Sequence, residues 1–214
     1  LAVVDPELML SVPAGFTAFQ GFDALFHSVE GYIAKGANLM SDMYALTAIE
    51  NLAKYLPRAV KDGNDMEART HVAFANTLSG GVMCLTLLTS EHGMEHALSA
   101  YHPSLPHGAG LIMISRAYFS YFIRKHACDE RFIRMARALG MPEADKPEDF
   151  ITALTRLQEA CGVADLKMSD YGIALDECEK LMRNAREVMG IMFTSDRVQM
   201  SDAEIVDIYK ESWK

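Results

Sequence analysis

The chain has no cluster of basic residues and no long apolar run, and each absence excludes a class of protein. Its 29 Asp and Glu outnumber its 20 Lys and Arg, which gives a formal net charge of −9. Nucleic-acid binding needs clustered positive charge, so we expect no nucleic-acid partner. No stretch approaches the roughly 20 apolar residues of a membrane span, and no basic segment of the signal-peptide kind opens the sequence. We therefore expect no membrane partner either.

Cysteine is scarce and scattered. The four cysteines, Cys84, Cys128, Cys161 and Cys178, form no C-x-x-C pair. This spacing fits neither a zinc nor a disulfide framework, and it predicts buried free thiols in the reducing cytoplasm. The composition is typical of a globular protein, with 214 residues of which half are hydrophobic and 23% are charged. This length is sufficient for a substantial hydrophobic core.

Apart from its first residues, the chain shows the 3.6-residue periodicity of helices. The opening LAVV predicts a buried strand. Because a lone strand leaves its edges unpaired, we expect residues 1–13 to be the end of an upstream α/β domain or a linker. Residues 14–214 are predicted to form an all-α, multi-helix bundle. The predicted helices cover 19–35 (ended by Gly36), 39–63, 65–88 (the central buried helix), 90–100, 108–125, 129–140, 147–162, 176–189 and 201–213, the last opened by a capping box at Ser201 and Glu204.

The first candidate site residues lie in the segment GFDALFHSVEGY. Asp23 and His27 are four residues apart on a predicted helix and therefore share a face, with Glu30 one turn further along. A carboxylate and an imidazole on an apolar face are costly to bury unless they are paired or bound to a metal. A hydrogen-bonded Asp–His pair in a core would explain this segment by itself.

A second cluster follows in SEHGMEHALSAYHPSLPHG, which holds four of the seven histidines. His92 and His96 again share a helical face, and His107 is presented between Pro106, which restricts the backbone, and Gly108, which permits a tight turn. Two such i,i+4 pairs and the rigidly presented imidazole of His107 exceed what a core usually holds. A divalent metal with nitrogen and oxygen ligands explains both clusters together.

Two other interpretations remain open from the residues alone. HGMEH matches H-x-x-E-H, the pattern of a zinc peptidase in which both histidines bind the metal and Glu95 is the general base. That interpretation gives no role to Asp23, His27 or His107. The other alternative is a non-catalytic helical domain, with a structural metal or with none. Structural sites favour closed ligand sets that often include thiolates, and the cysteines here lie elsewhere.

Three segments in order, GFDALFHSVEGY, DMEAR and HGMEHALSAYHPSLPHG, resemble the helical C-terminal domain of the iron-containing (group III) alcohol dehydrogenases, a dehydroquinate synthase-like fold. The resemblance is strongest from Asp5 to Gly110, and the remainder matches in helical layout and in SDAEIVDIY. Gln20 stands where members often have Thr. After PHG the chain reads AGLIMIS, where members usually show Asn and a later Pro, and the loop before His107 is about one residue longer than usual.

The resemblance implies roles for five residues. In that family one Asp and three His bind a single catalytic divalent metal, and the matching positions are Asp23, His27, His92 and His107. His96 matches a further histidine that lies near the metal and the nicotinamide ring. It is therefore the expected catalytic and cofactor-contacting residue, as a proton relay.

The resemblance also implies an activity, cofactors and partners. The chain is expected to be the metal-binding catalytic half of an NAD(P)-dependent alcohol dehydrogenase that oxidises alcohols or reduces aldehydes, with Fe2+, Zn2+ or another divalent ion as Lewis acid. NAD(P) would be bound mainly by an upstream nucleotide-binding domain. No Gly-rich loop between strand and helix occurs here, since Ser79–Gly81 falls inside a predicted helix. We expect the chain by itself to be inactive, its substrate to be a small alcohol or aldehyde, and a homodimer to be one assembly worth testing.

Overall fold

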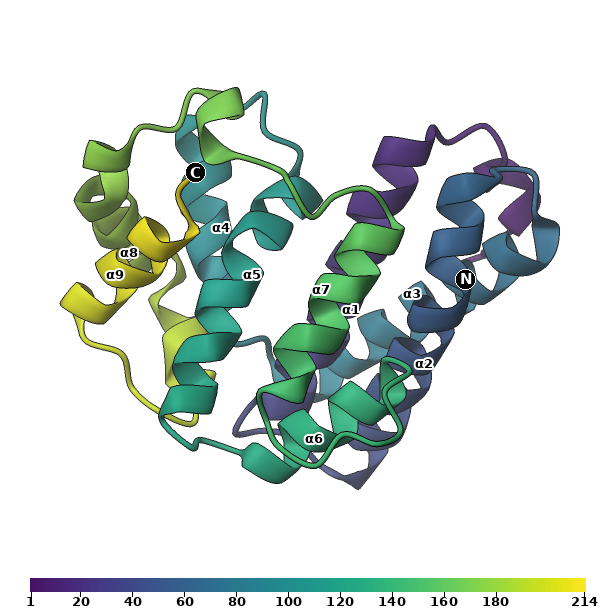
Figure 1. The fold of residues 1–214 in the computed structure, drawn as a ribbon, viewed down its shortest axis with the longest axis horizontal. Coiled ribbons are helices and arrows are strands. Elements are labelled where there is room, and N and C mark those ends of the chain that lie inside the picture. The colour runs from purple at the N-terminus through teal and green to yellow at the C-terminus, as the bar shows by residue number, and fades with distance from the viewer.

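The computed structural model describes all 214 residues and contains no strand. The all-α prediction is confirmed (Figure 1). Three short 3₁₀ helices accompany nine α-helices. The elements are η1 (Pro6–Met9), α1 (Ala14–Ile33), α2 (Leu39–Lys61), α3 (Met66–Thr86), α4 (Ser90–Tyr101), α5 (His107–Arg124), α6 (Asp129–Ala138), α7 (Asp149–Ala160), η2 (Met168–Tyr171), η3 (Leu175–Glu177), α8 (Cys178–Ser195) and α9 (Asp202–Ser212).

The predicted N-terminal strand is wrong for this structure. Residues 1–5 have no regular secondary structure, and Leu1 and Val3 are exposed. The physical reason is the absence of a partner strand, without which an extended segment cannot satisfy its backbone hydrogen bonds in a sheet. The first element of the chain that packs against the helical bundle is η1, which contacts α3.

Side-chain caps begin three of the α-helices, α2, α3 and α9, and Asp65 caps α3 by accepting a hydrogen bond from the Ala68 N–H. The Asn38 carboxamide accepts hydrogen bonds from the backbone N–H groups at the start of α2, and Ser201 and Glu204 form the predicted capping box of α9. The predicted end of the first helix is wrong. α1 ends at Ile33 because Ala34 is already extended, so Gly36 is not its C-cap.

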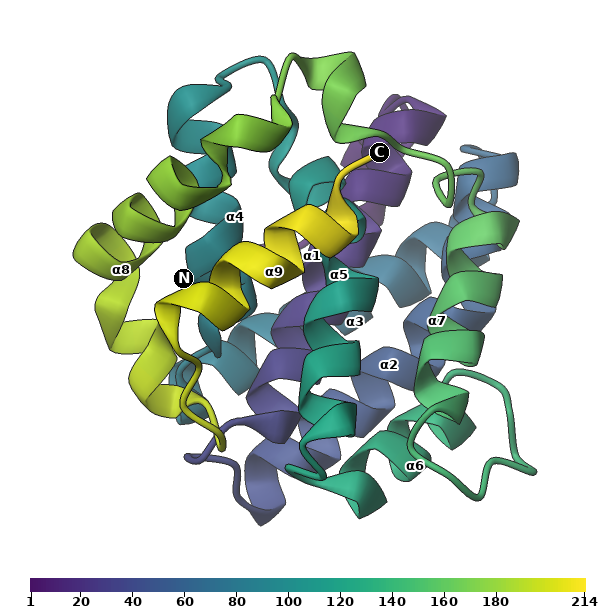
Figure 2. The ribbon, with the colours of Figure 1, turned by 60° about the vertical axis from the view of Figure 1, so that its left-hand side comes forward.

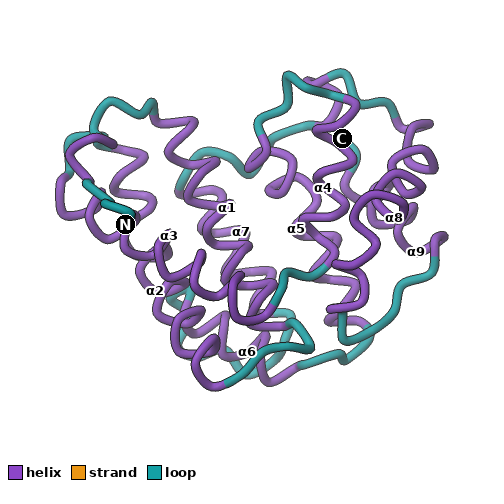
Figure 3. Tube along the Cα trace, turned by 180° about the vertical axis from the view of Figure 1, so that it is seen from behind, coloured by secondary structure: helices purple, strands orange, loops and turns teal.

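The helices form two groups that meet along α1 and α5. One group contains α1, α2 and α3 with α6 and α7, and the other contains α4, α5, α8 and α9 (Figures 1 and 2). Seen from behind, the groups diverge towards the top of the view (Figure 3). A single cluster of 50 buried apolar residues includes side chains from both groups, so they share one core.

The central helices differ from the prediction. α1 and α5 each bury 13 residues, whereas α3 buries only seven and exposes Phe74, Met83 and Leu85. The segment 65–88 is thus an apolar helix on the outside of the bundle. The cysteine prediction is wrong in part: all four thiols are free, but Cys84 on α3 is exposed and Cys128 is half-buried.

None of the helices alone has the length and apolar character needed to cross a bilayer. α3 and α4 together satisfy those criteria as a pair bent by 108°, on length and composition only.

Candidate metal centre

α1 presents Asp23 and His27 towards the junction of the two helix groups. The Nδ1 of His27 lies 2.8 Å from the main-chain oxygen of Asp23 and 3.2 Å from its carboxylate Oδ1. With Nδ1–H donating to that main-chain carbonyl, the lone pair of His27 is on Nε2. The predicted i,i+4 neighbours on the helix are therefore in contact.

α4 brings His92 to the same carboxylate. His92 is almost fully buried, and its Nε2 lies 3.2 Å from Asp23 Oδ1. Its Nδ1 is hydrogen-bonded to the carboxylate of Glu30, which is completely buried and also accepts a hydrogen bond from the Thr89 hydroxyl at 2.9 Å. One ring nitrogen is thus occupied by Glu30, while the other faces Asp23.

His107 reaches the site as the first residue of α5. Pro106 is its N-cap, and the Nε2 of His107 lies 3.4 Å from Asp23 Oδ1. Gly108 makes this approach feasible, because a Cβ at that position would collide with the main-chain carbonyl of Phe19 on α1. Only glycine lets the start of α5 come this close to α1, which places His107 opposite Asp23.

Three of the four predicted ligands therefore converge. The ligand atoms of Asp23, His92 and His107 all lie within 4.8 Å of one another. His27 is not in that group, although its ring centroid is 4.3 Å from that of His92. One carboxylate oxygen with imidazole nitrogens is a donor set that suits Fe2+ or Zn2+, so these residues fit a divalent metal.

The electrostatics of the cluster are those of a site that holds positive charge. Burial alone would raise the pKa of Asp23, but hydrogen bonds from His107, His27 and His92 hold it well below its usual range. Burial opposes charging of His92, yet the negative charge of Glu30 and a hydrogen bond to Asp23 bring its pKa to about 9. For His107, hydrogen bonds to Asp23 and Glu95 outweigh burial and bring the pKa to about 10. A metal ion would replace these protons.

His96 differs from its neighbours. Burial is the main cause that lowers its pKa, so the ring is neutral at pH 7. Its ring centroid lies 5.4 Å from that of His107 and 6.3 Å from that of His92. It also belongs to a second group of potential ligands, with Glu95 and His107, which shares His107 with the first.

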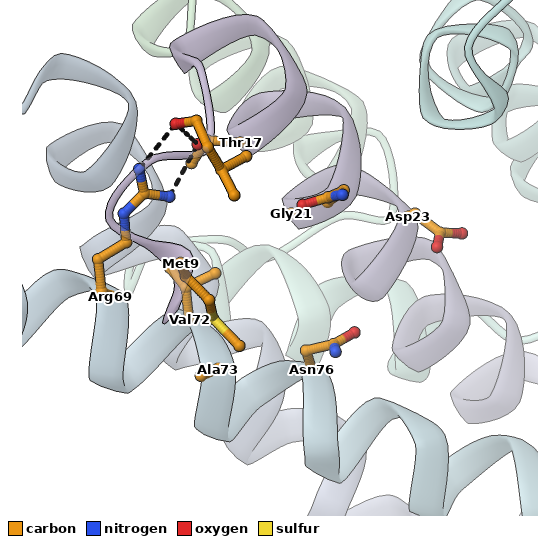
Figure 4. A pocket seen from close by; sticks show the side chains of 10 residues that line it. Met9, Thr17, Gly21, Asp23, Arg69, Val72, Ala73 and Asn76 are labelled. Carbon is orange, nitrogen blue, oxygen red and sulfur yellow. Dashed lines mark hydrogen bonds between the residues drawn. The ribbon is translucent and has the colours of Figure 1, made fainter. Parts of the chain in front are cut away.

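A cavity of about 330 Å³ lies beside Asp23, between η1, the start of α1, and α3 (Figure 4). At the end away from Asp23, the buried Arg69 donates hydrogen bonds to the Thr17 hydroxyl and the Val12 carbonyl, at 2.8 and 3.0 Å. The wall combines polar and apolar side chains: Thr17, Gln20, Asn76, Met9, Val12 and Val72. The space is sufficient for a small organic molecule next to the candidate metal carboxylate.

Comparison with known protein families identifies the class to which the chain belongs. Residues 17–213 match the model of the Fe-containing alcohol dehydrogenase family, C-terminal. The chain belongs to the iron-containing alcohol dehydrogenases.

Individual relatives agree with this assignment. The chain is 43% identical to alcohol dehydrogenase 4 of Schizosaccharomyces pombe over 185 residues, which cover 84% of this chain and 44% of that protein. It is 31% identical to the NAD-dependent methanol dehydrogenase of Bacillus methanolicus over 201 residues, 87% of this chain and 49% of the other. The chain spans about half the length of these relatives.

A solved structure shows the same fold. The archaeal halo-thermophilic Red Sea brine pool alcohol dehydrogenase ADH/D1 bound to NZQ superposes with a TM-score of 0.92 at 29% identity. The match covers 97% of this chain and 53% of that one. The helical bundle therefore corresponds to the C-terminal domain of the iron-containing alcohol dehydrogenase family.

Family membership argues against the peptidase interpretation of HGMEH, and so does the geometry. The general base of a peptidase must reach the attacking water, but Glu95 is completely buried and hydrogen-bonded to His107 and the Ser99 hydroxyl. The ring centroids of His92 and His96 are 6.3 Å apart, and the two ring planes meet at 89°. The hydrogen-bond partners of His92 are Asp23 and Glu30, not His96. The spacing of the motif is present without its function.

Reasoning from the sequence missed the carboxylates behind the site. Sequence spacing puts Glu30 only near the helix face of Asp23 and His27, and for Glu95 it indicates only the role of a peptidase base. Glu91 is fully buried, and neither of its carboxylate oxygens has a hydrogen-bond partner. Burial, and then the charge of Glu30, raises the pKa of Glu91 well above its usual range. The available signal was the density of acidic residues on faces that are otherwise apolar.

Asp196 secures the helix that carries His92. It follows α8 and accepts hydrogen bonds from the Ser90 backbone N–H at 3.0 Å and the Ser90 hydroxyl at 2.7 Å, at the start of α4. Burial is the main cause that raises its pKa to about 7, and the nearby charge of Glu30 contributes in the same direction.

This raised pKa makes stability depend on pH. The folded state favours protonated Asp196, so its contribution is complete below pH ~4 and is lost as pH rises to about 7. Relative to Asp196→Asn, which stays neutral, the wild type should lose on the order of 4 kcal/mol of unfolding free energy over that range, at about 1.4 kcal/mol per pKa unit. Urea unfolding of both proteins at pH 4 and pH 7.5, followed by circular dichroism, measures this. An equal difference between the two proteins at both pH values would contradict it.

Proposed function

We propose that this chain is the metal- and substrate-binding half of an NAD(P)-dependent, iron-type alcohol dehydrogenase. The observation that carries the proposal is the convergence of Asp23, His92 and His107 from three helices on one point, with His27 beside them. Family membership supports the same reaction class. The substrates that we propose are small alcohols and the corresponding aldehydes.

Asp23, His92 and His107 would hold the metal, with His27 as the fourth ligand through its free Nε2. A bound divalent cation supplies Lewis-acid polarisation of the alcohol or aldehyde oxygen. Residues of this chain would orient the substrate and transfer its proton. The cavity lined by Gln20 and Asn76 orients the substrate beside Asp23. A ring nitrogen of His96, neutral at pH 7, accepts the hydroxyl proton of the alcohol and returns it in the reverse direction.

The direct test is metal stoichiometry. Protein purified anaerobically with Fe2+, or in air with Zn2+, should carry close to one metal ion per chain after gel filtration, because the two groups of potential ligands share His107 and therefore hold one ion between them. Elemental analysis against protein concentration measures this ratio. Binding that disappears on gel filtration would contradict a built site.

The proposal assigns NAD(P) binding mainly to an upstream domain, and that assignment has its own test. Pyrophosphate recognition uses backbone N–H groups at a Gly-rich helix N-terminus. Ser79, Gly80 and Gly81 instead lie within α3. We expect no saturable NADH binding and no alcohol turnover by this chain, measured by NADH fluorescence titration and by absorbance of NADH. Tight saturable binding of NADH to this chain would contradict the assignment of NAD(P) binding to an upstream domain.

A further inference from the structure

Glu95 is a buried carboxylate that the proposed reaction does not use. Its side chain lies on α4 with none of its surface exposed. One carboxylate oxygen is hydrogen-bonded to Nδ1 of His107, and the other accepts a hydrogen bond from the Ser99 hydroxyl one turn along. Burying an ionisable group is costly unless it is paired, and both carboxylate oxygens of Glu95 have a partner here.

The hydrogen bond to Glu95 determines which nitrogen His107 offers to a ligand. If Nδ1–H donates to Glu95, the lone pair of the neutral ring is on Nε2, and Nε2 is the atom 3.4 Å from Asp23 Oδ1. His92 shows the same arrangement, with Nδ1 on the buried Glu30 and Nε2 towards Asp23. Carboxylates that hold the second nitrogen of a ligand histidine are a common device for orienting it.

Gly110 supplies the space that Glu95 occupies. Gly110 lies one turn after His107 on α5, and a Cβ built there would be 2.5 Å from Glu95 Oε1 and 2.8 Å from its Cγ. Glycine inside a helix destabilises it relative to alanine. Nothing in the backbone geometry requires glycine here, because Gly110 is not among the glycines with positive φ. The requirement at this position is room for the carboxylate.

We propose that Glu95 is a positioning residue that fixes the tautomer and orientation of His107, and that Gly110 provides the space for it. The inference rests on the proposed metal site, since it gives the reason why Nε2 of His107 faces that site. Glu95 does for His107 what Glu30 does for His92. Glu95 acts through His107 and does not touch the substrate.

Zinc affinity, measured by competition with a chromogenic chelator, tests this proposal without any enzymatic assay. Glu95→Ala removes the acceptor for Nδ1–H and should weaken Zn2+ binding about 10- to 100-fold. Glu95→Gln keeps an amide oxygen at the same place, so its loss should stay below about tenfold. Unchanged affinity in Glu95→Ala, with unchanged thermal melting, would overturn the proposal.

Gly110→Ala keeps every ligand and both carboxylates but displaces Glu95, and we expect it also to weaken Zn2+ binding. Gly80→Ala on α3 is the matched control, since a Cβ there meets nothing within 4 Å; its affinity should equal that of the wild type. In a Glu95→Ala background the Gly110→Ala change should have no further effect, because the two act through one carboxylate. Additive losses would overturn the coupling between these residues.

The same measurement separates the other outcomes. If Glu95, His96 and His107 were the true ligands, His96→Ala would lose zinc while Asp23→Ala kept it, and Glu95 would be a ligand and not a positioning residue. A wild-type protein that binds no zinc would refute the proposed function together with this inference. Wild-type binding with full affinity in Glu95→Ala and Gly110→Ala would refute this inference alone.

Discussion

Replacing Asp23 by alanine should reduce the bound metal from about one ion per chain to nearly none. Asp23 is the carboxylate on which the site converges, with Nε2 of His92 at 3.2 Å and Nε2 of His107 at 3.4 Å from its Oδ1. Its strongly lowered pKa means that it supplies a full negative charge at neutral pH. Without it, the remaining imidazoles carry no charge to offset that of a divalent cation.

The measurement is elemental analysis of wild-type and variant protein purified in parallel. Asp23→Asn retains the shape of the side chain and should lose most of the metal as well, which separates the loss of charge from a packing defect. His126→Ala is the control, because the side chain of His126 is exposed and is hydrogen-bonded to Asp129, outside the ligand cluster. A full complement of metal in Asp23→Ala, with its circular dichroism unchanged, would refute the proposed site.

The second large effect distinguishes two histidines that share one face of α4. His92→Ala should lose most of the metal, because its Nε2 points at Asp23 and its ring is held by Glu30. His96→Ala should keep the metal, because His96 is not in the group that contains Asp23. In a protein that joins this chain to the proposed nucleotide-binding domain, His96→Ala should lower turnover ~10²- to 10⁴-fold, the usual range for loss of a general acid–base group.

Metal content and alcohol oxidation, measured together on both variants, decide the assignment. The expected pattern is loss of metal in the first variant, and retained metal with lost turnover in the second. Equal metal loss in the two variants would make His96 a ligand. Retained turnover in His96→Ala would remove its role as a proton relay.

Much of this protein was predictable because the relevant signals are local. Helical periodicity and capping residues such as Ser201 depend on neighbours within one or two turns, and the all-α bundle followed from them. The pairing of Asp23 with His27 follows from the four-residue spacing, which places both side chains on one face of α1. The candidate metal site was predicted from such pairs and from the family resemblance together.

Other expectations failed because they depend on partner segments that local sequence patterns do not describe. LAVV has the composition of a strand, but there is no second strand here to pair with it. The segment 65–88 is apolar enough for a central helix, yet α1 and α5 take that position, because burial depends on which helices pack on both sides.

By itself the sequence determined which residues share a helical face, because the pitch of the α-helix makes that a matter of counting. Only the tertiary structure decided which faces meet. It joined Asp23 to His92 and His107 across three helices, left His27 beside that group, and turned Glu95 from an apparent peptidase base into the buried partner of His107. The physical reason is that contacts between helices depend on close packing, as in the fit of Gly108 against the backbone of Phe19, and sequence spacing does not encode that distance.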